Sequence, residues 1–307
     1  MQSKVSVVIP TYNMSRYVGP AIESLLSQDA GLEIIVVDDG STDDTRAVLE
    51  RYPVKYIYQK NHGCCGAGRN TGLRYVTGEY IAFLDADDLA CPGRIAAQAK
   101  LLDENPGVGA VYTDHRDFRE NEAERPNHFA GCPRILKALN GADSTVLARQ
   151  EARDILLEEN FALPSALMIR RSALTHVPGF SLETRIGEDF HFAFSIARHW
   201  DIGLIALVGA QRRLHGTNIS GDSLLYLQYG VIMRELLRAS EPSPLLRRKL
   251  ALGIKRSQNS LARELANRGE FRESFVHARD IKTFVRTLVL SVIGSAGKKA
   301  GGQRVTQ

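Results

Sequence analysis

The feature that most constrains the fold is a regular alternation of short apolar runs and amphipathic segments over residues 1–118. The apolar runs are rich in β-branched residues, as is typical of buried strands, and the intervening segments carry apolar residues at helical spacing. Strands that alternate with helices of this length predict a parallel sheet with helices on both faces. The predicted strands are 4–10, 32–40, 54–59, 79–84 and 108–118, and the predicted helices are 15–28, 41–52, 63–76 and 91–104.

The remainder of the chain loses this rhythm. Segment 119–160 begins as a polar, irregular stretch and then turns helical, so we interpret it as a loop and helix insertion beside the site. From about residue 222 the pattern is almost entirely helical. The other predicted elements are a strand and short helix in 162–174, a helix over 187–200, two short strands in 201–216 and a helical hairpin over 261–281 that is hinged at Gly269.

This organisation predicts three regions. We expect an α/β domain over 1–220, with halves 1–118 and 119–220. A helical region over 221–293 follows it, and the composition of 294–307 predicts a disordered tail.

Composition argues against several classes of protein. The net charge of +4 comes without a dense Lys/Arg block in the first two thirds of the chain, so nucleic-acid binding is not expected. The four cysteines show no C-x-x-C spacing, which predicts reduced thiols of an intracellular protein. The N-terminus lacks the long apolar stretch of a signal peptide, and no run approaches the ~20 apolar residues of a membrane span. We therefore expect a cytoplasmic protein.

Three carboxylates, Asp85, Asp87 and Asp88, follow the fourth predicted strand. Ligands of such sheets bind beyond the carboxyl ends of the strands. Clustered carboxylates repel one another unless a cation lies among them, and Mg²⁺ or Mn²⁺ takes oxygen ligands together with substrate phosphates. The acids therefore indicate a metal–diphosphate site. The alternative is that they cap the helix that begins near Cys91, which would explain one acid better than three.

Two further acids, Asp38 and Asp39, end the second predicted strand. A strand-end acid in an α/β sheet commonly accepts hydrogen bonds from a nucleoside. The alternative is an Asx-turn that leads into the next helix, which needs only one of the two acids.

The Gly-rich stretch 63–72 matches neither the dinucleotide fingerprint nor the P-loop. This counts against dehydrogenases and P-loop NTPases. Within the stretch, Arg69 has two open roles: it contacts a nucleotide, or it pairs with a strand-end aspartate.

Glu188 and Asp189 open the helix that is predicted over 187–200. A carboxylate within hydrogen-bond reach of an acceptor hydroxyl can remove its proton as the hydroxyl attacks. Capping of the helix N-terminus is an equally good reading of these acids from the residues alone. His215, next to Gly216, reads by itself as a surface histidine in a turn.

Six stretches, in this order, resemble the inverting family 2 glycosyltransferases, which have the GT-A fold. They are VSVVIPTYN, IIVVDDGSTDDT, NHGCCGAGRNTGL, GEYIAFLDADD, GEDFHFAFSIA and RRLHGTNIS. The resemblance covers residues 5 to about 220 and is specific, because several short motifs agree at once. It implies a GT-A nucleotide-binding fold with a mostly parallel central sheet, a nucleotide-sugar half over 1–118, an acceptor half over 119–220 and a C-terminal helical appendage.

The resemblance also implies a nucleotide-sugar donor, usually a uridine diphosphate sugar, and a glycan or lipid-linked saccharide as acceptor. Asp39 would bind uracil and Asp85 the ribose. The residues implied in donor binding are Pro10, Thr11, Tyr12, Asp39, Arg69, Asp85, Ala86 and Arg213. The chain departs from the family at Gly68, where alanine is usual, and we expect little functional consequence.

For the chemistry, the resemblance implies a bound divalent cation, Mn²⁺ or Mg²⁺. Asp87 and His215 would hold it, and Asp88 would be either a further ligand or a supporting acid. Asp189 would be the general base, with Glu188 beside it.

The segment 280–294 is amphipathic, with Lys282 and Arg286 opposite its apolar residues. Three roles stay open for it: a helix docked on the rest of the chain, an interfacial helix on an anionic membrane, or a surface for homodimerisation.

Two other functions are alternatives to glycosyl transfer. A nucleotidyltransferase that makes sugar nucleotides usually has a Gly-rich loop with Arg or Lys right after the first strand, where this chain has TYNMSRYVG. A non-catalytic nucleotide-sugar binding module would not need Asp87, Asp189 and His215, which are all present.

Overall fold

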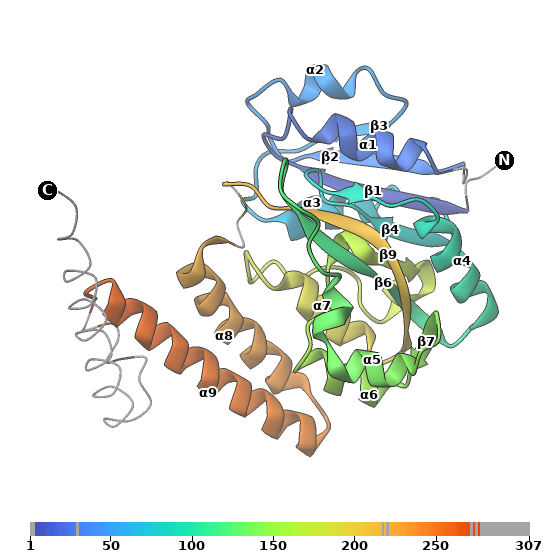
Figure 1. Cartoon of the computed structure of the whole chain (residues 1–307). Coiled ribbons are helices and arrows are strands. Elements are labelled where there is room, and N and C mark those ends of the chain that lie inside the picture. Colours follow the sequence, from blue (N-terminus) through green and yellow to red (C-terminus); the bar gives the residue numbers. More distant parts are fainter. Residues whose placement is uncertain are drawn as a thin grey trace, which may run out of the picture. The chain divides into compact units, whose positions relative to one another are not determined.

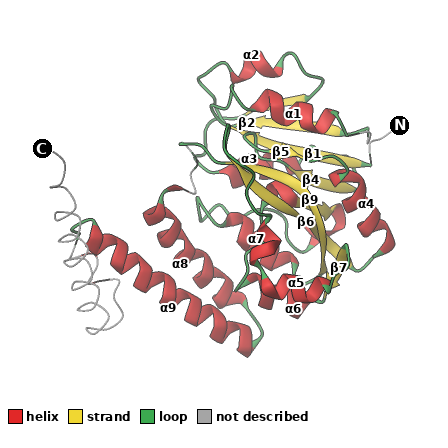
Figure 2. Ribbon diagram, viewed as in Figure 1, coloured by secondary structure: helices red, strands yellow, loops and turns green. Residues whose placement is uncertain are grey.

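A single mixed sheet, surrounded by helices, organises the first part of the chain (Figure 1; Figure 2). The structure, a computed structural model, describes residues 4–28, 31–216, 218, 221–270, 273 and 276. The chain divides into two compact units, Met1–Asn218 and Ile219–Gln307.

The strands of the first unit are β1 (Val5–Thr11), β2 (Glu33–Asp38), β3 (Lys55–Tyr58), β4 (Tyr80–Phe83), β5 (Leu89–Ala90), β6 (Val108–Phe118), β7 (Ser144–Leu147), β8 (Leu167–Arg170) and β9 (Asp201–Arg213). Its α-helices are α1 (Val18–Leu26), α2 (Thr45–Leu49), α3 (Cys65–Leu73), α4 (Arg94–Glu104), α5 (Pro133–Leu139), α6 (Arg149–Leu156) and α7 (Glu188–Ile196). Short 3₁₀ turns lie at His128–Gly131, Pro164–Ala166 and Arg171–Thr175.

Strand β1 shows why helices cover both faces of the sheet. Every residue of β1 is buried. Val7 and Ile9 lie in one apolar cluster with Ile22 of α1. Val8 faces α3 instead, and a Cβ at Gly72 would lie 2.4 Å from its Cγ1 atom. Because successive side chains of a strand point to opposite faces, α1 and α3 cover opposite sides of β1. The predicted α/β architecture is confirmed.

The order of the sheet is β3-β2-β1-β4-β8-β6-β9-β5, with β7 paired to β9. β1 runs parallel to β2 and β4, β2 to β3, and β6 to β9. β8 runs antiparallel to both of its neighbours, and β5 and β7 run antiparallel to β9. The sheet is thus less parallel than the sequence pattern predicts. A regular helical crossover enforces parallel pairing of the strands that it joins. Where an irregular connection replaces it, the apolar pattern of a strand does not show its direction.

Strand β9 corrects the prediction of two separate short strands in 201–216. Thr113 of β6 lies opposite Ile205, but the next residue, Asp114, lies opposite Val208. The residues skipped on β9 form a bulge, so the apolar pattern breaks while the strand continues. Close packing continues beyond the bulge, since a Cβ at Gly209 would lie 2.3 Å from Thr113 Oγ1.

The segment 134–160, which the sequence predicts as helical, contains a strand between two helices. β7 pairs with β9 from Ser144 opposite Ile205 to Leu147 opposite Ile202. Four residues are too few to separate a strand from a helical turn by periodicity, which explains why β7 was not predicted.

The second unit contains helices α8 (Ser223–Ser240) and α9 (Pro244–Asn267). Asp222 caps α8 by accepting hydrogen bonds from the backbone of Leu224 and Leu225, and Ser243 caps α9, which has proline at its first position. Among the described residues, no helix has the length and apolarity needed to cross a membrane.

The first helix of the predicted hairpin over 261–281 is the last part of a longer helix. Residue 261 lies inside α9, which continues to Asn267, and Gly269 follows with φ +83°. A glycine in this left-handed conformation is a common end of a helix. Most of 271–281, the segment 280–294 and the tail 294–307 lie outside the described residues.

Candidate active site

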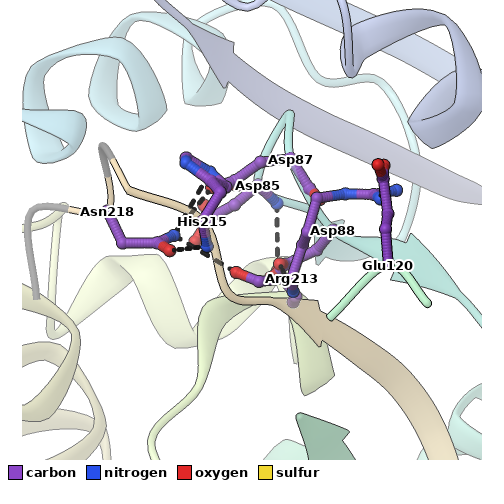
Figure 3. A network of polar contacts seen from close by, with 8 residues as sticks. Asp85, Asp87, Asp88, Glu120, Arg213, His215 and Asn218 are labelled. Carbon is purple, nitrogen blue, oxygen red and sulfur yellow. Dashed lines mark hydrogen bonds and ion pairs between the residues drawn. The ribbon is translucent and has the colours of Figure 1, made fainter. Parts of the chain in front are cut away.

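The three predicted acids lie at the end of β4, and each has its own partner within the protein (Figure 3). Asp85 pairs with Arg69, Asp87 with His215, and Asp88 accepts from Ser165. The repulsion among the acids is thus offset by the protein's own groups. It does not by itself demand a bound cation, so the case for a metal depends on the geometry around Asp87.

Asp85 belongs to a buried network that also contains Glu188. Arg69 places Nη2 2.5 Å from Asp85 Oδ1 and Nη1 2.8 Å from Glu188 Oε1. Only 3% of the Arg69 side chain is exposed. Burial lowers the pKa of Arg69, but the charges of Asp85 and Glu188 outweigh burial and raise it, so the guanidinium stays charged. Of the two roles predicted for Arg69, the structure has the pair with a strand-end aspartate.

Asp87 has a different kind of partner. Its Oδ2 atom lies 2.9 Å from His215 Nε2, and the Asn218 side-chain amide donates to the same oxygen at 3.3 Å (Figure 3). Asn218 Oδ1 accepts from the backbone N–H of His215, which ties the turn together. Burial and the charge of Asp85 raise the pKa of Asp87, while the contact with His215 opposes that shift.

Asp88 uses both carboxylate oxygens within the protein. Oδ2 accepts from Ser165 Oγ at 2.5 Å and Oδ1 from the backbone N–H of Arg213 at 2.9 Å. Burial, followed by the charges of Asp87 and Asp85, raises the pKa of Asp88 well above its usual value. These contacts favour a supporting role that fixes the end of β9. Its role at a metal stays a prediction.

Arg213 is held in place on several sides. Its Nε donates to the carbonyl of Asp87 at 2.9 Å, and Nη1 pairs with Glu120 at 2.8 Å. Its guanidinium lies over the rings of Tyr17 and Phe118, 5.1 and 4.6 Å from their centroids. Arg213 therefore orients the main chain of Asp87 through the hydrogen bond to its carbonyl.

The Asp87–His215 pair fits a divalent cation. Two ligands at neighbouring corners of an octahedral ion, each at ~2.1 Å, lie about 3 Å apart. The 2.9 Å between Asp87 Oδ2 and His215 Nε2 is a hydrogen-bond distance that is also compatible with this spacing. Within the part of the chain that the structure describes, no group of three or more His, Cys, Asp or Glu side chains is placed to hold an ion. Substrate phosphates and water would therefore have to supply the other ligands, as is usual for Mg²⁺.

Asp189 lies in the first turn of α7, next to Glu188. Its Oδ1 atom accepts from the backbone N–H of Phe190. Burial, followed by the negative charge of Glu188, raises the pKa of Asp189 to about 7. A carboxylate with this pKa is suited to take a proton near neutral pH. Glu188 does not act only as a helix cap, because it pairs with Arg69.

The second predicted cluster forms where β1 and β2 end side by side, with Thr11 opposite Asp38. Asp38 accepts from Ser41 N–H, as the predicted Asx-turn requires, and from Tyr56. Asp39 accepts instead from Gln59 Nε2 at 2.6 Å and from the backbone of His62. The two buried acids thus divide between a turn and contacts with the segment that follows β3.

The remaining predicted donor residues have mixed surroundings. Thr11 is buried, and its hydroxyl finds no hydrogen-bond partner among the described residues. Tyr12 is 46% exposed, while Ala86 is buried between the acids. Pro10 lies in β1 under α3, where a Cβ at Gly68 would come 3.0 Å from its Cβ.

Several residues of the site were not predicted. The Tyr17 ring stacks on His215 with centroids 4.9 Å apart. Ser165 bridges two of the acids, since it also accepts from the backbone N–H of Asp85. Glu120 comes from the segment that was read as irregular. These contacts join residues about 80 to 200 positions apart, and no local pattern marks them.

Solved structures share this fold. S. aureus TarS in complex with UDP superposes with a TM-score of 0.66 at 18% identity, covering 95% of this chain and 92% of that one. The mannosyltransferase PcManGT from Pyrobaculum calidifontis, in complex with GDP-Man and Mn²⁺, superposes with a TM-score of 0.60 at 18% identity, covering 99% and 89%. The predicted GT-A type of fold is confirmed.

Sequence comparison extends the likeness. An uncharacterized glycosyltransferase of Rickettsia felis is 32% identical over 236 residues, which are 73% of this chain and 34% of that protein. The chain spans about a third of the length of the curated relatives it matches. The family described as Glycosyl transferase family 2 matches residues 6–177, more than half of the chain. The chain therefore belongs to glycosyl transferase family 2.

Proposed function

We propose that the chain is a metal-dependent, inverting glycosyltransferase. It moves a sugar from a nucleotide diphosphate sugar, in particular a uridine diphosphate sugar, to a hydroxyl group of a growing glycan or a lipid-linked saccharide. Membership of glycosyl transferase family 2 supports the reaction class, and the UDP complex of TarS supports the donor class. The reduced thiols expected from the cysteine spacing support a cytoplasmic location.

The donor nucleoside would bind where β1 and β2 end. Asp39 directly follows β2, and its Oδ2 atom, which among the described residues accepts only from the backbone N–H of His62, could also accept from a base N–H. The buried Thr11 hydroxyl, which lacks a partner among the described residues, adds a polar group close to the same edge. Asp85 retains an exposed side-chain fraction of 26% beside Arg69, which leaves an oxygen for a ribose hydroxyl.

The diphosphate would bind beyond Asp87. Asp87 and His215 would hold a divalent cation, with the Asn218 amide fixing both side chains. When bound, such a cation neutralises the negative charge that develops on the leaving diphosphate. Arg213 donates to the Asp87 carbonyl and is itself held by Asp88, so both residues keep Asp87 in place.

Asp189 would act as the general base. Its place in the first turn of α7, next to the Glu188 that Arg69 links to Asp85, carries the proposal, and its raised pKa of about 7 supports it. The Phe190 N–H fixes the carboxylate, which would take the proton of the acceptor hydroxyl as its oxygen attacks the anomeric carbon. Attack opposite the leaving diphosphate inverts that carbon and needs no covalent enzyme intermediate.

A thermal-shift screen of nucleotide sugars, with and without Mn²⁺, tests the donor. A bound donor raises the melting temperature because it stabilises only the folded state. The best donor is then incubated with glycan acceptors, and release of the nucleotide diphosphate is measured. The proposal fails if no nucleotide sugar shifts the melting temperature, or if Asp189→Asn transfers sugar as fast as the unaltered protein.

A further inference from the structure

A cavity of about 350 Å³ opens beside His215, and the proposed function assigns no ligand to its side formed by Arg16 and Glu120. It is lined by residues from three separate segments: the start of α1, the loop after β6 and the end of β9. Its charged lining residues are Arg16, Arg119, Arg213, His215, Glu120 and Glu122. Three guanidinium groups face two carboxylates, so the lining carries an excess of positive charge.

Glu120 bridges two of these arginines. Its Oε1 atom lies 2.8 Å from Arg213 Nη1, and its Oε2 atom lies 2.7 Å from Arg16 Nη2. Each carboxylate oxygen thus accepts from a different guanidinium. This is the arrangement in which two arginines bind the oxygens of a single oxyanion.

Arg213 is the best fixed member of the bridge. The Arg213 side chain is 8% exposed and is held between the rings of Tyr17 and Phe118. Arg16 lies over the ring of Tyr17, 5.4 Å from the ring centroid. Glu120 is 48% exposed and sits in a loop without regular structure. Arg16 is 70% exposed, so both the Arg16 and the Glu120 side chains can turn toward a ligand while Arg213 keeps its position.

We propose that Arg16 and Arg213 form a binding site for a phosphate-type oxyanion of a substrate, and that Glu120 competes with that oxyanion for both arginines. A phosphate group presents three oxygens and up to two negative charges, so it can replace a carboxylate on paired guanidinium groups. The site adjoins His215, so this inference rests on the proposed function. Two sources share this chemistry: the diphosphate of the donor and a phosphate group carried by the acceptor.

Isothermal titration of the full chain tests the competition. Glu120→Gln removes the competing charge while keeping the size of the side chain. We expect it to tighten oxyanion binding about threefold or more, because it frees two partly exposed ion pairs. One titration uses UDP with Mn²⁺. The other uses inorganic phosphate, first alone and then with the nucleotide site saturated by UDP and Mn²⁺.

The matched control is Glu124→Gln. Glu124 lies in the same loop and pairs with Arg116 at 2.6 Å, but it does not line the cavity. Glu124→Gln removes the same charge from the same region, so the affinities of this variant for UDP and phosphate should stay within about twofold of those of the unaltered protein. The double variant Arg16→Gln, Glu120→Gln should lose the gain, and Arg16 is 70% exposed, so its change should not disturb folding.

The two titrations distinguish the sources. A gain in affinity for UDP but not for phosphate assigns the site to the donor diphosphate. A gain for phosphate in the presence of saturating UDP assigns it to the acceptor. The proposal is overturned if Glu120→Gln changes neither affinity, or if Glu124→Gln produces an equal gain. If UDP does not bind at all, the proposed function fails, while phosphate titrated alone still tests the oxyanion site.

Discussion

Asp85 and Asp87, which flank Ala86, have opposite kinds of partner. Asp85 pairs with a buried guanidinium that keeps its proton, whereas Asp87 pairs with an imidazole, which can be neutral. A metal ion binds only deprotonated ligands, so it can take the place of a proton between Asp87 and His215 but not between Asp85 and Arg69. Two carboxylates of one short motif are thereby suited to different tasks.

Each carboxylate anchors a separate group of residues. The first group, which we call the acceptor group after the role proposed for Asp189, consists of Asp85, Arg69, Glu188 and Asp189. The second, which we call the metal group after its proposed cation, consists of Asp87, His215 and Asn218. In the acceptor group the protein supplies the balancing charge itself. In the metal group the partner of the Asp87 carboxylate is the His215 imidazole, and the proposed cation would bind between the two. The predictions below separate the two groups.

The largest expected effect is in the acceptor group. Asp189→Asn should lower kcat by about 10²- to 10⁴-fold, since it removes the general base. Affinity for UDP with Mn²⁺ should stay unchanged, because the metal group is intact. Single-turnover transfer assays and titration of UDP check the two halves of this prediction. Unaltered transfer would show that another residue is the base.

Arg69→Met should reduce the free energy of unfolding by about 3 kcal/mol, since it leaves the buried Glu188 and the partly buried Asp85 without their cation. Urea unfolding measures the loss. Arg46→Met is the matched control, because the Arg46–Glu50 pair is exposed and should be worth under about 1 kcal/mol. Equal losses for both variants would mean that the buried network does not hold the acceptor group together.

Asp87→Asn should weaken UDP binding by about 10- to 100-fold in Mn²⁺ and leave the metal-free affinity unchanged. Asp85→Asn is its control. It removes a carboxylate two positions away but should keep the gain in affinity that Mn²⁺ provides. The comparison between the two acids breaks down if Asp85→Asn, and not Asp87→Asn, abolishes the response to Mn²⁺.

The smallest expected effect concerns pH. Asp189 must be deprotonated to act, and its pKa is about 7, so kcat/KM should fall about tenfold per unit as the pH drops below 7. Glu188→Gln removes the negative charge that helps to raise this pKa, so the midpoint should move to lower pH. A pH–rate profile of both proteins measures the shift, and a midpoint that stays in place would exclude the influence of Glu188.

The regular first part of the chain was largely predictable. Its strands and helices follow from apolar spacing, and the polar clusters after β1, β2 and β4 had to meet because these strands are parallel neighbours. The part of the chain after residue 118 was less predictable. The bulge in β9 hides a single strand behind a broken pattern, and β7 is too short for its periodicity to be read. Both elements depend on pairing with distant strands, which local spacing does not record.

The sequence alone determined the fold class, the family and the strand ends at which the acids gather. These depend on local periodicity and on motifs of a few neighbouring residues. Only the tertiary structure decided which partner each acid has. Arg69 meets Glu188 across 119 positions, and Asp88 meets the Arg213 backbone across 125. The physical reason is that a carboxylate pairs with whatever donor the packed chain brings within hydrogen-bond distance. The packing of strands and helices decides which donor that is, and local sequence patterns do not record it.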